Sequence, residues 1–399
     1  KKTPGAGSDR EPMAAPALAP TSDIDTKRYD RQIRLWGLET QRGLQGTRLL
    51  LLRATGLCNE IAKNLVLAGI GHVSIADPDA VSQADLEHGG VFSLSKDNLG
   101  SNKAEAMASR LKELNPSVEV EGIPKPLEQL TDQELRSFHI VVGTHGLQGV
   151  DDLAAATDRL CGADGEPAAA PNGNGNGKKR LRDEAPEAKG NGSHEIVPTR
   201  SGAMPQLLAA GTLGLFGFCA LDLMAHTHRV VKKAKKEDEE PPPPEHFVVR
   251  YPALRDAFRV GWRSLDRRTP RLYAALQLLP RGGGQEEVEA RRAERLEEDG
   301  LKETFLREPL TAEYVATVVR HAATELSPMC AIVGGTVAAE VIKLVEIAAG
   351  KGQVAPINNV LLFDNSDGAQ AAGITGRFGP AFRTDDGGVD KGTPQPVAA

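Results

Sequence analysis

Cysteine is scarce in this chain and is never clustered. The 399 residues include four cysteines, and Cys58, Cys161, Cys219 and Cys330 lie far apart in the sequence. This spacing excludes a paired C-x-x-C zinc site, and it is unlike the dense disulfide framework of a small secreted protein. We therefore expect a protein of a reducing compartment, without a structural metal site built from cysteine.

The chain also lacks an excess of positive charge and a long uninterrupted apolar run. Its formal net charge is −6, which argues against a general nucleic-acid binder. The most apolar long segment, residues 330–349, contains Glu340, Lys343 and Glu346, so it indicates a buried helix and not a membrane span. No apolar leader occurs in the first 25 residues, and because the first residue is Lys1, the position of the native N-terminus stays open.

Short apolar runs alternate with amphipathic segments in the first half of the chain. The apolar runs predict strands at 47–52, 72–77, 118–122 and 139–143, and the amphipathic segments predict helices at 57–69, 101–114 and 148–160. Such alternation is typical of an α/β fold, in which helices cover both faces of a parallel sheet.

Polar stretches rich in glycine and proline interrupt this pattern and predict the domain organisation. Residues 162–202 are too polar to bury a core, and a second break contains four consecutive prolines. The apolar sequence that follows each break predicts that one α/β domain continues across it. The expected divisions are a disordered tail at 1–26, the first part of the domain at 27–161, a disordered insertion at 162–202, the continuation of the domain at 203–231, a linker at 232–246, a helical insertion at 247–327, the C-terminal part of the domain at 328–383 and a disordered tail at 384–399.

The loop after the first predicted strand, residues 53–58 (RATGLC), lies where a dinucleotide-binding domain has G-x-G-x-x-G. Those glycines permit a tight turn, a close approach of the backbone to a phosphate, and close packing of the helix on the strand. Gly56 is the one glycine in this loop, and Arg53 puts a bulky cation at the turn. The sequence therefore predicts the architecture of a nucleotide-binding enzyme with a degenerate phosphate cradle.

Residues 28–37 (RYDRQIRLWG) resemble the N-terminal signature of the ubiquitin-like-protein activating enzymes, which are related to the bacterial ThiF/MoeB adenylyltransferases. Further segments match this family at 75–79 (IADPD), 100–104 (GSNKA), 328–335 (PMCAIVGG) and 363–364 (FD). The resemblance implies a Rossmann-like adenylation domain of the ThiF/MoeB type, paired with a second such domain about a two-fold axis. It also implies that the pair activates the carboxyl terminus of a ubiquitin-like protein with ATP and magnesium.

The resemblance gives Arg31 a specific role. In this family the equivalent arginine reaches across the dimer and contacts ATP phosphate in the partner's active site, where a guanidinium stabilises developing negative charge. The alternative is that Arg31 only pairs with a carboxylate or a helix end at the dimer interface.

Three parts of the family's ATP site are altered in this chain. The first is the loop at 53–58. At 84–90 (ADLEHGG), Glu87 and His88 stand where active members have Asn and Arg on the phosphates, and at 143–147 (GTHGL) no carboxylate stands where active members hold magnesium. We therefore expect neither a nucleotide nor a metal ion in this chain, and none of its cysteines has the context of the family's thioester nucleophile. The degenerate site comprises Arg53, Gly56, Cys58, Asp77, Glu87, His88, Lys103 and Gly146, of which Asp77 and Lys103 match the family.

A chain with this signature and a degenerate ATP site resembles the inactive half of a heterodimeric activating enzyme. The match is closest to the small, Aos-type subunits of the SUMO-activating enzymes, and the Nedd-type and ubiquitin-type inactive halves are the alternatives. The resemblance implies a catalytic partner subunit that holds ATP, magnesium and the thioester cysteine, with SUMO and the SUMO-conjugating enzyme reached through the complex. It also favours a nuclear localisation signal over a solvated charge run for the basic cluster in the insertion. That cluster consists of Lys178, Lys179, Arg180, Leu181 and Arg182.

Three other interpretations compete with this one. An autonomous ThiF/MoeB-like adenylyltransferase needs a working ATP loop, which residues 53–58 do not provide. A nicotinamide-dependent oxidoreductase agrees with the strand–helix pattern and with Asp77, but it does not account for the signature at 28–37. A pure scaffold that supports its partner's fold would tolerate the loss of Arg31. No contact with nucleic acid or membrane is expected in any of them.

Overall fold

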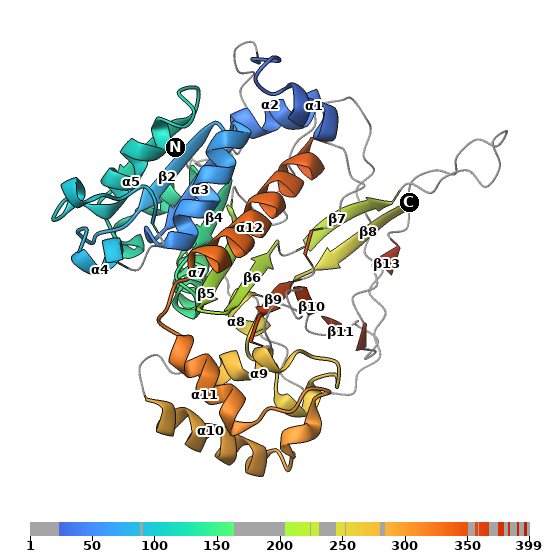
Figure 1. Cartoon of the computed structure of the whole chain (residues 1–399). Coiled ribbons are helices and arrows are strands. Elements are labelled where there is room, and N and C mark those ends of the chain that lie inside the picture. Colours follow the sequence, from blue (N-terminus) through green and yellow to red (C-terminus); the bar gives the residue numbers. More distant parts are fainter. Residues whose placement is uncertain are drawn as a thin grey trace, which may run out of the picture.

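The computed structural model of the chain is a sheet covered by helices, with a helical unit at one end (Figure 1). It describes residues 24–87, 91–162, 204–223, 225–230, 245–251, 253–279, 284–349, 356–357 and 359–366, together with short strands between 374 and 396. The basic cluster at 178–182, nearly all of the predicted insertion at 162–202, and residues 1–23 lie outside the described residues, as does His88.

The main sheet has eight strands in the order β10-β9-β6-β5-β4-β1-β2-β3. The five strands from β5 to β3 in this order pair in parallel, and β6, β9 and β10 pair antiparallel to their neighbours. This arrangement confirms the predicted Rossmann-like α/β fold. The strand bounds are β1 Arg48–Leu52, β2 His72–Ala76, β3 Glu119–Ile123, β4 Ile140–Gly143, β5 Gln206–Leu213, β6 Phe216–Asp222, β9 Val360–Asp364 and β10 Ile374–Phe378.

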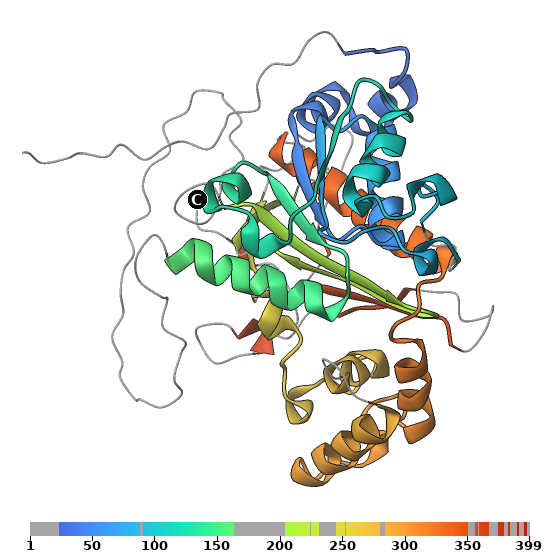
Figure 2. The same ribbon diagram turned by 90° about the vertical axis from the view of Figure 1, so that its left-hand side faces the viewer.

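Helices cover both faces of this sheet. In β1, Leu49 and Leu51 join the core beneath one group of helices, whereas Leu50 and Leu52 join the core on the other face, as the alternation of a strand requires. Figure 2 shows α7 (green) across the sheet from α3 and α12. The first face carries α1 Asp30–Trp36, α2 Leu38–Gly46, α3 Gly56–Ala68, α5 Lys103–Lys112 and α12 Ser327–Ala348, and the second carries α7 Leu147–Gly162 and α8 Leu254–Ala257. The short helices α4 Gln83–Glu87, η1 Lys96–Asn98, η2 Leu127–Gln129 and α6 Asp132–Arg136 lie in the connections.

The helices between residues 262 and 321 form a unit below the sheet in Figure 1. Its core is continuous with the second face of the sheet, because Phe216 of β6 meets Tyr314 edge-on at 5.8 Å and Phe218 meets Phe258 at 5.2 Å. Tyr314 also donates to the buried Asp364 of β9 at 2.6 Å. The unit therefore shares the core of the main domain. It contains η3 Trp262–Ser264, α9 Arg271–Leu278, α10 Gln285–Glu298, η4 Glu303–Phe305 and α11 Ala312–His321.

Two predicted divisions differ from the structure. The segment 203–231 was expected to continue the main sheet, but its last part forms β7 Ala225–Val230, which pairs with β8 Glu245–Arg250 in a separate three-stranded sheet completed by β13 Gln395–Pro396. The end of the predicted linker and the start of the helical insertion are thus a strand. β11 Phe382–Arg383 pairs with β12 Val389–Asp390. Both β12 and β13 lie within residues 384–399, the tail that was predicted to be disordered.

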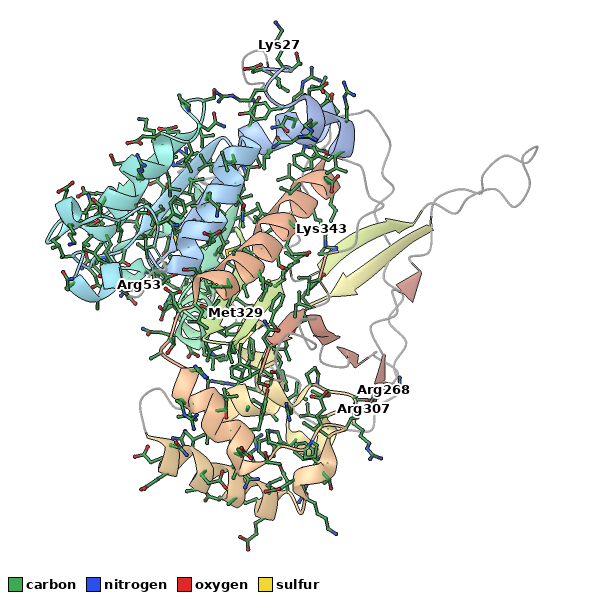
Figure 3. All side chains as sticks on the ribbon, viewed as in Figure 1. Lys27, Arg53, Arg268, Arg307, Met329 and Lys343 are labelled. Atoms are coloured by element: carbon green, nitrogen blue, oxygen red, sulfur yellow. The ribbon has the colours of Figure 1, made fainter. Side chains whose placement is uncertain are left out.

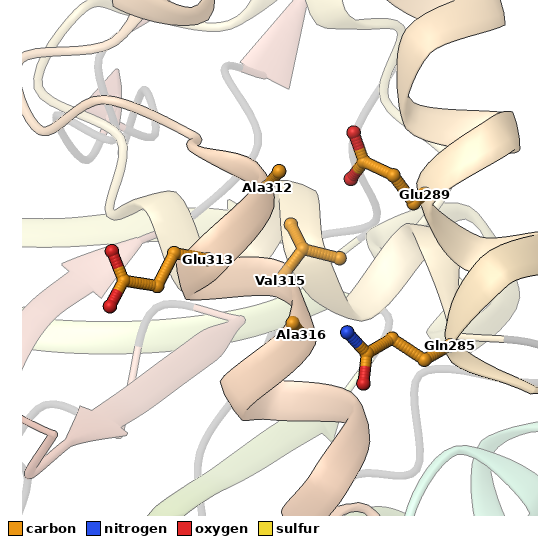
Figure 4. Close-up of a pocket in the computed structure, with 6 residues that line it drawn as sticks. All are labelled: Gln285, Glu289, Ala312, Glu313, Val315 and Ala316. Carbon is orange, nitrogen blue, oxygen red and sulfur yellow. The ribbon is translucent and has the colours of Figure 1, made fainter.

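Two surface hollows lie in the helical unit. One, of about 190 Å³, opens between α10 and α11 (Figure 4). The other, of about 520 Å³, is lined by Asp266, Arg267, Arg268 and Arg307. Neither contains a residue of the predicted nucleotide site. Over the part of the chain that the structure describes, no helix combines the length and the hydropathy that crossing a bilayer requires.

Candidate nucleotide site and an exposed arginine

The loop between β1 and α3 makes its turn without a glycine. Arg53 adopts a φ of 73°, the left-handed conformation that glycine adopts with least strain. Thr55 then caps α3, because its side-chain oxygen accepts from the N–H of Cys58 at 3.1 Å. The loop therefore combines a left-handed turn at Arg53 with a capped helix start at Thr55.

The first amides of α3 are bound by a carboxylate from a distant part of the chain. The Gly56 N–H donates to Glu325 Oε2 at 2.8 Å, and the Leu57 N–H donates to Glu325 Oε1 at 3.3 Å. Glu325 lies between α11 and α12. Burial raises the pKa of Glu325, and the two N–H donors together with Lys103 act in the opposite direction. These amides would face a nucleotide phosphate in an active member of the resembled family.

Asp77, one of the two site residues that match the family, accepts hydrogen bonds within the loop. It is 2% exposed, and its carboxylate accepts from the N–H of Ala54 at 2.7 Å and from the N–H of Asp79 at 2.9 Å. Arg53 reaches over it, with Nη1 3.4 Å from Asp77 Oδ1, and the same guanidinium also contacts Asp79. The arginine that replaced glycine is therefore neutralised by two carboxylates.

Lys103, the other retained family residue, is also paired. Its Nζ lies 2.7 Å from Asp85 Oδ1, and both side chains are more than four-fifths buried. Although burial raises the pKa of Asp85, hydrogen bonds from Lys103 and Ser82 outweigh it and hold that pKa below its usual value. Glu87 ends α4, but its side chain lies outside the described residues.

The end of β4 offers hydroxyl and imidazole groups where an active member would hold magnesium. Thr144 Oγ1 donates to the carbonyl oxygens of Leu52 and Arg53, and it lies 3.1 Å from Thr55 Oγ1. Gly146 follows with a φ of 71°. Within the described residues, no group of three or more His, Cys, Asp or Glu side chains could hold a metal ion. Backbone and side-chain contacts thus bring together the predicted residues Arg53, Gly56, Asp77, Lys103 and Gly146 at the carboxyl end of the parallel strands.

Three of the cysteines lie in the core. Cys58, Cys219 and Cys330 are each fully buried, and burial raises the pKa of all three thiols, in Cys330 to about 12. A thiol with so high a pKa is a poor nucleophile near neutral pH. The side chain of Cys161 lies outside the described residues.

Arg31 lies at the opposite end of α3 from this site. Its helix, α1, is rooted by Tyr29, which is 2% exposed, packs against Gly69 at the C-terminal cap of α3 and accepts from Asn115 Nδ2 at 2.9 Å. Because α3 has 13 residues, its two ends are about 20 Å apart. In Figure 3, Arg53 lies beside the lower end of α3, whereas Lys27, just before α1, lies at the top.

The Arg31 side chain is exposed, and within the described residues no carboxylate pairs with it. Arg34 differs, because it pairs with Asp30 one turn away at 3.0 Å. Leu35 is 79% exposed, the highest value among the large apolar side chains that the structure describes, and it lies four residues after Arg31 on the same face of α1. α1 thus presents a cation and an apolar side chain outward.

A second outward surface is formed by α3 and α12, which lie side by side (Figure 1). Three large apolar side chains are exposed on or beside these helices, namely Leu67 at 50%, Phe92 at 47% and Ile332 at 45%. The neighbouring Gly335 leaves open space where a side chain would begin. We call Leu67, Phe92, Ile332 and Gly335 the α3–α12 surface.

Sequence reasoning missed Glu325. The residue is 269 positions from Gly56, lies just before the matched segment at 328–335, and belongs to no motif of the nucleotide loop. Its role follows only from the pairing of two segments that are distant in the sequence.

Comparison with known proteins gives one family and a consistent set of relatives. The model of the ThiF family matches residues 29–373. SUMO-activating enzyme subunit 1 of Xenopus laevis is 28% identical over 354 residues, which cover 86% of this chain and 93% of the relative. The Homo sapiens protein of the same name is 28% identical and covers 90% and 96%. DNA damage tolerance protein rad31 of Schizosaccharomyces pombe is 26% identical and covers 85% and 94%.

Proposed function

This chain belongs to the ThiF family, and on that premise we propose that it is the small, non-catalytic subunit of a SUMO-activating enzyme. The similarity to relatives of that name along nearly their whole length supports the proposal. The complex would adenylate the C-terminus of SUMO with ATP, form a thioester with SUMO on the catalytic subunit, and transfer SUMO to the conjugating enzyme.

In this proposal ATP and magnesium are bound by the catalytic subunit, and Arg31 of this chain completes that site. The observation that carries this part is the separation of Arg31 from the chain's own loop by the length of α3, about 20 Å. An arginine side chain is far shorter than this distance. The Arg31 guanidinium cannot reach a nucleotide in this chain's own loop, so the nucleotide that it contacts would be bound by a neighbouring subunit.

Arg31 would bind and orient the phosphates of ATP held by the partner. Charge develops on the α-phosphate and on the departing pyrophosphate as the SUMO carboxylate attacks, and a fixed guanidinium stabilises that charge more than it stabilises the ground state. The role suits Arg31 better than Arg34, because Arg34 is already paired with Asp30. Adenylation by this chain alone is not expected, since its own cations Arg53 and Lys103 are both paired with carboxylates.

Two surfaces would contact the catalytic subunit. Leu35 would fill an apolar site on the partner beside Arg31, and the α3–α12 surface would pack against helices of the partner. Burial of these exposed apolar side chains against the partner would favour association. The basic cluster at 178–182 would direct the subunit to the nucleus.

The test is SUMO-dependent exchange of pyrophosphate into ATP, measured with this chain alone, with the catalytic subunit alone, and with the two together. We expect exchange only in the mixture, and a drop of about 100-fold when Arg31→Ala replaces the wild-type subunit, because a guanidinium on a reacting phosphate supplies a few kcal/mol of stabilisation. Arg34→Ala is the matched control and should leave exchange within about twofold. Robust exchange by this chain alone, or equal effects of the two substitutions, would contradict the proposal.

A further inference from the structure

The first turn of α3 has an oxyanion bound to it, and the oxyanion comes from the chain itself. Both carboxylate oxygens of Glu325 accept from consecutive amides, those of Gly56 and Leu57, at 2.8 and 3.3 Å. A phosphate group binds a helix N-terminus in the same way, because free N–H groups and the helix dipole both favour negative charge there. The contact therefore reproduces the binding of a nucleotide phosphate, with a side chain as the ligand.

We propose that Glu325 is a built-in replacement for the nucleotide phosphate and that it closes this chain's own nucleotide site. The inference rests on the proposed function in one respect, namely that the loop from Arg53 to Cys58 derives from an ATP loop.

The backbone holds Glu325 in this position from both sides. On one side, the Gly214 N–H donates to the carbonyl oxygen of Thr324 at 2.7 Å. On the other, the Cys330 N–H donates to the carbonyl oxygen of Leu326 in the first turn of α12. The carboxylate is thus delivered by a fastened segment, which lowers the entropic cost of keeping it on the amides.

The surrounding charges also favour a carboxylate that is part of the fold over an incoming phosphate. Within the described residues, Arg53 is paired with Asp77 and Asp79, and Lys103 is paired with Asp85. Since these neighbouring acids are balanced by their paired cations, the negative group that a phosphate would meet at the amides is Glu325 itself. The phosphate would have to displace Glu325 to reach the amides of α3.

Thermal unfolding of the full chain without its partner tests this inference, with inorganic pyrophosphate as the probe at constant ionic strength. The wild-type Tm should not respond to pyrophosphate. Glu325→Ala frees both amides, so its Tm should be lower without ligand and should rise saturably, by about 2 °C, with pyrophosphate. Glu128→Ala, at an exposed acid on η2, is the matched control and should behave as the wild type.

Each result decides the inference. A folded Glu325→Ala chain with no response to pyrophosphate would overturn it, as would an equal response in the wild type. If Glu325→Ala does not fold, Glu325→Gln keeps the shape of the side chain and removes its charge, and its Tm must then rise with pyrophosphate. Because the assay contains neither the catalytic subunit nor SUMO, its failure would leave the action of Arg31 on the partner untouched.

Discussion

Tyr29 allows the placement of Arg31 to be tested without changing Arg31. α1 contributes no buried residue of its own, so Tyr29 at its N-terminal cap is the main anchor of the helix. Loss of a buried aromatic side chain costs about 3–5 kcal/mol, whereas loss of a single hydrogen bond costs about 1 kcal/mol. Tyr29→Ala should therefore shift the equilibrium between docked and undocked α1 more than about 100-fold, and Tyr29→Phe only about fivefold.

Two measurements on the same variants follow this equilibrium. Hydrogen exchange should show lost protection of the Ile33 and Gly37 amides in Tyr29→Ala, because these amides bond within α1, while amides of β1 stay protected. SUMO-dependent pyrophosphate exchange by the heterodimer should fall nearly as far as with Arg31→Ala. Tyr251→Phe removes a hydrogen bond from another buried tyrosine, far along the chain, and should leave this activity unchanged. If Tyr29→Ala frees α1 and the heterodimer retains full activity, the reasoning that α1 positions Arg31 is refuted.

Three further outcomes are expected of the isolated chain. Asp85→Asn should lower the free energy of unfolding by about 1 kcal/mol at pH 7, because the pair with Lys103 is lost. Since folding lowers the pKa of Asp85, the stability advantage of the wild type in urea unfolding should vanish as the pH falls below about 4. A difference that stays constant with pH would count against the pair. Gly71→Ala would put a Cβ 1.9 Å from the carbonyl oxygen of Gln45, so little folded chain should be recovered, whereas Gly261→Ala meets open space and should give a normal yield. Tyr314→Phe should cost about 1–3 kcal/mol by leaving Asp364 without its 2.6 Å donor, and an unchanged Tm would show that this contact contributes nothing.

The parts of the fold that the sequence predicted are those with local causes. The apolar run at 49–52 forms the middle strand of the five parallel strands, and the helix after it begins within one residue of the predicted start. The helix predicted from 101 begins at Lys103 because Asn102 caps it by accepting from the Glu105 N–H. Periodicity and caps act over one or two turns, so they are visible in a single sequence.

The parts that were missed depend on contacts between distant segments. β7 and β8 pair with each other across residues 231–244, and nothing in either strand distinguishes that pairing from membership of the main sheet. Glu325 binds amides 269 and 268 residues away. The degenerate loop was predicted from its residue types alone. That its amides would be bound by a carboxylate depended on where the segment between α11 and α12 lies, which only the folded chain defines.

Leu35 separates binding of the partner from chemistry in the partner's site. Leu35 and Arg31 lie one turn apart on the same face of α1, yet they should affect different quantities. Leu35→Gln would put a polar, uncharged side chain where the proposed interface needs an apolar one, so the concentration of catalytic subunit needed for half-maximal exchange should increase about tenfold, with the same plateau. Arg31→Ala should lower the plateau and leave the half-maximal concentration nearly unchanged. Leu99→Gln, at another exposed leucine, directly after η1, is the matched control. If Leu35→Gln lowers only the plateau, Leu35 acts on the geometry of Arg31 and not on association, and the division of roles along α1 is wrong.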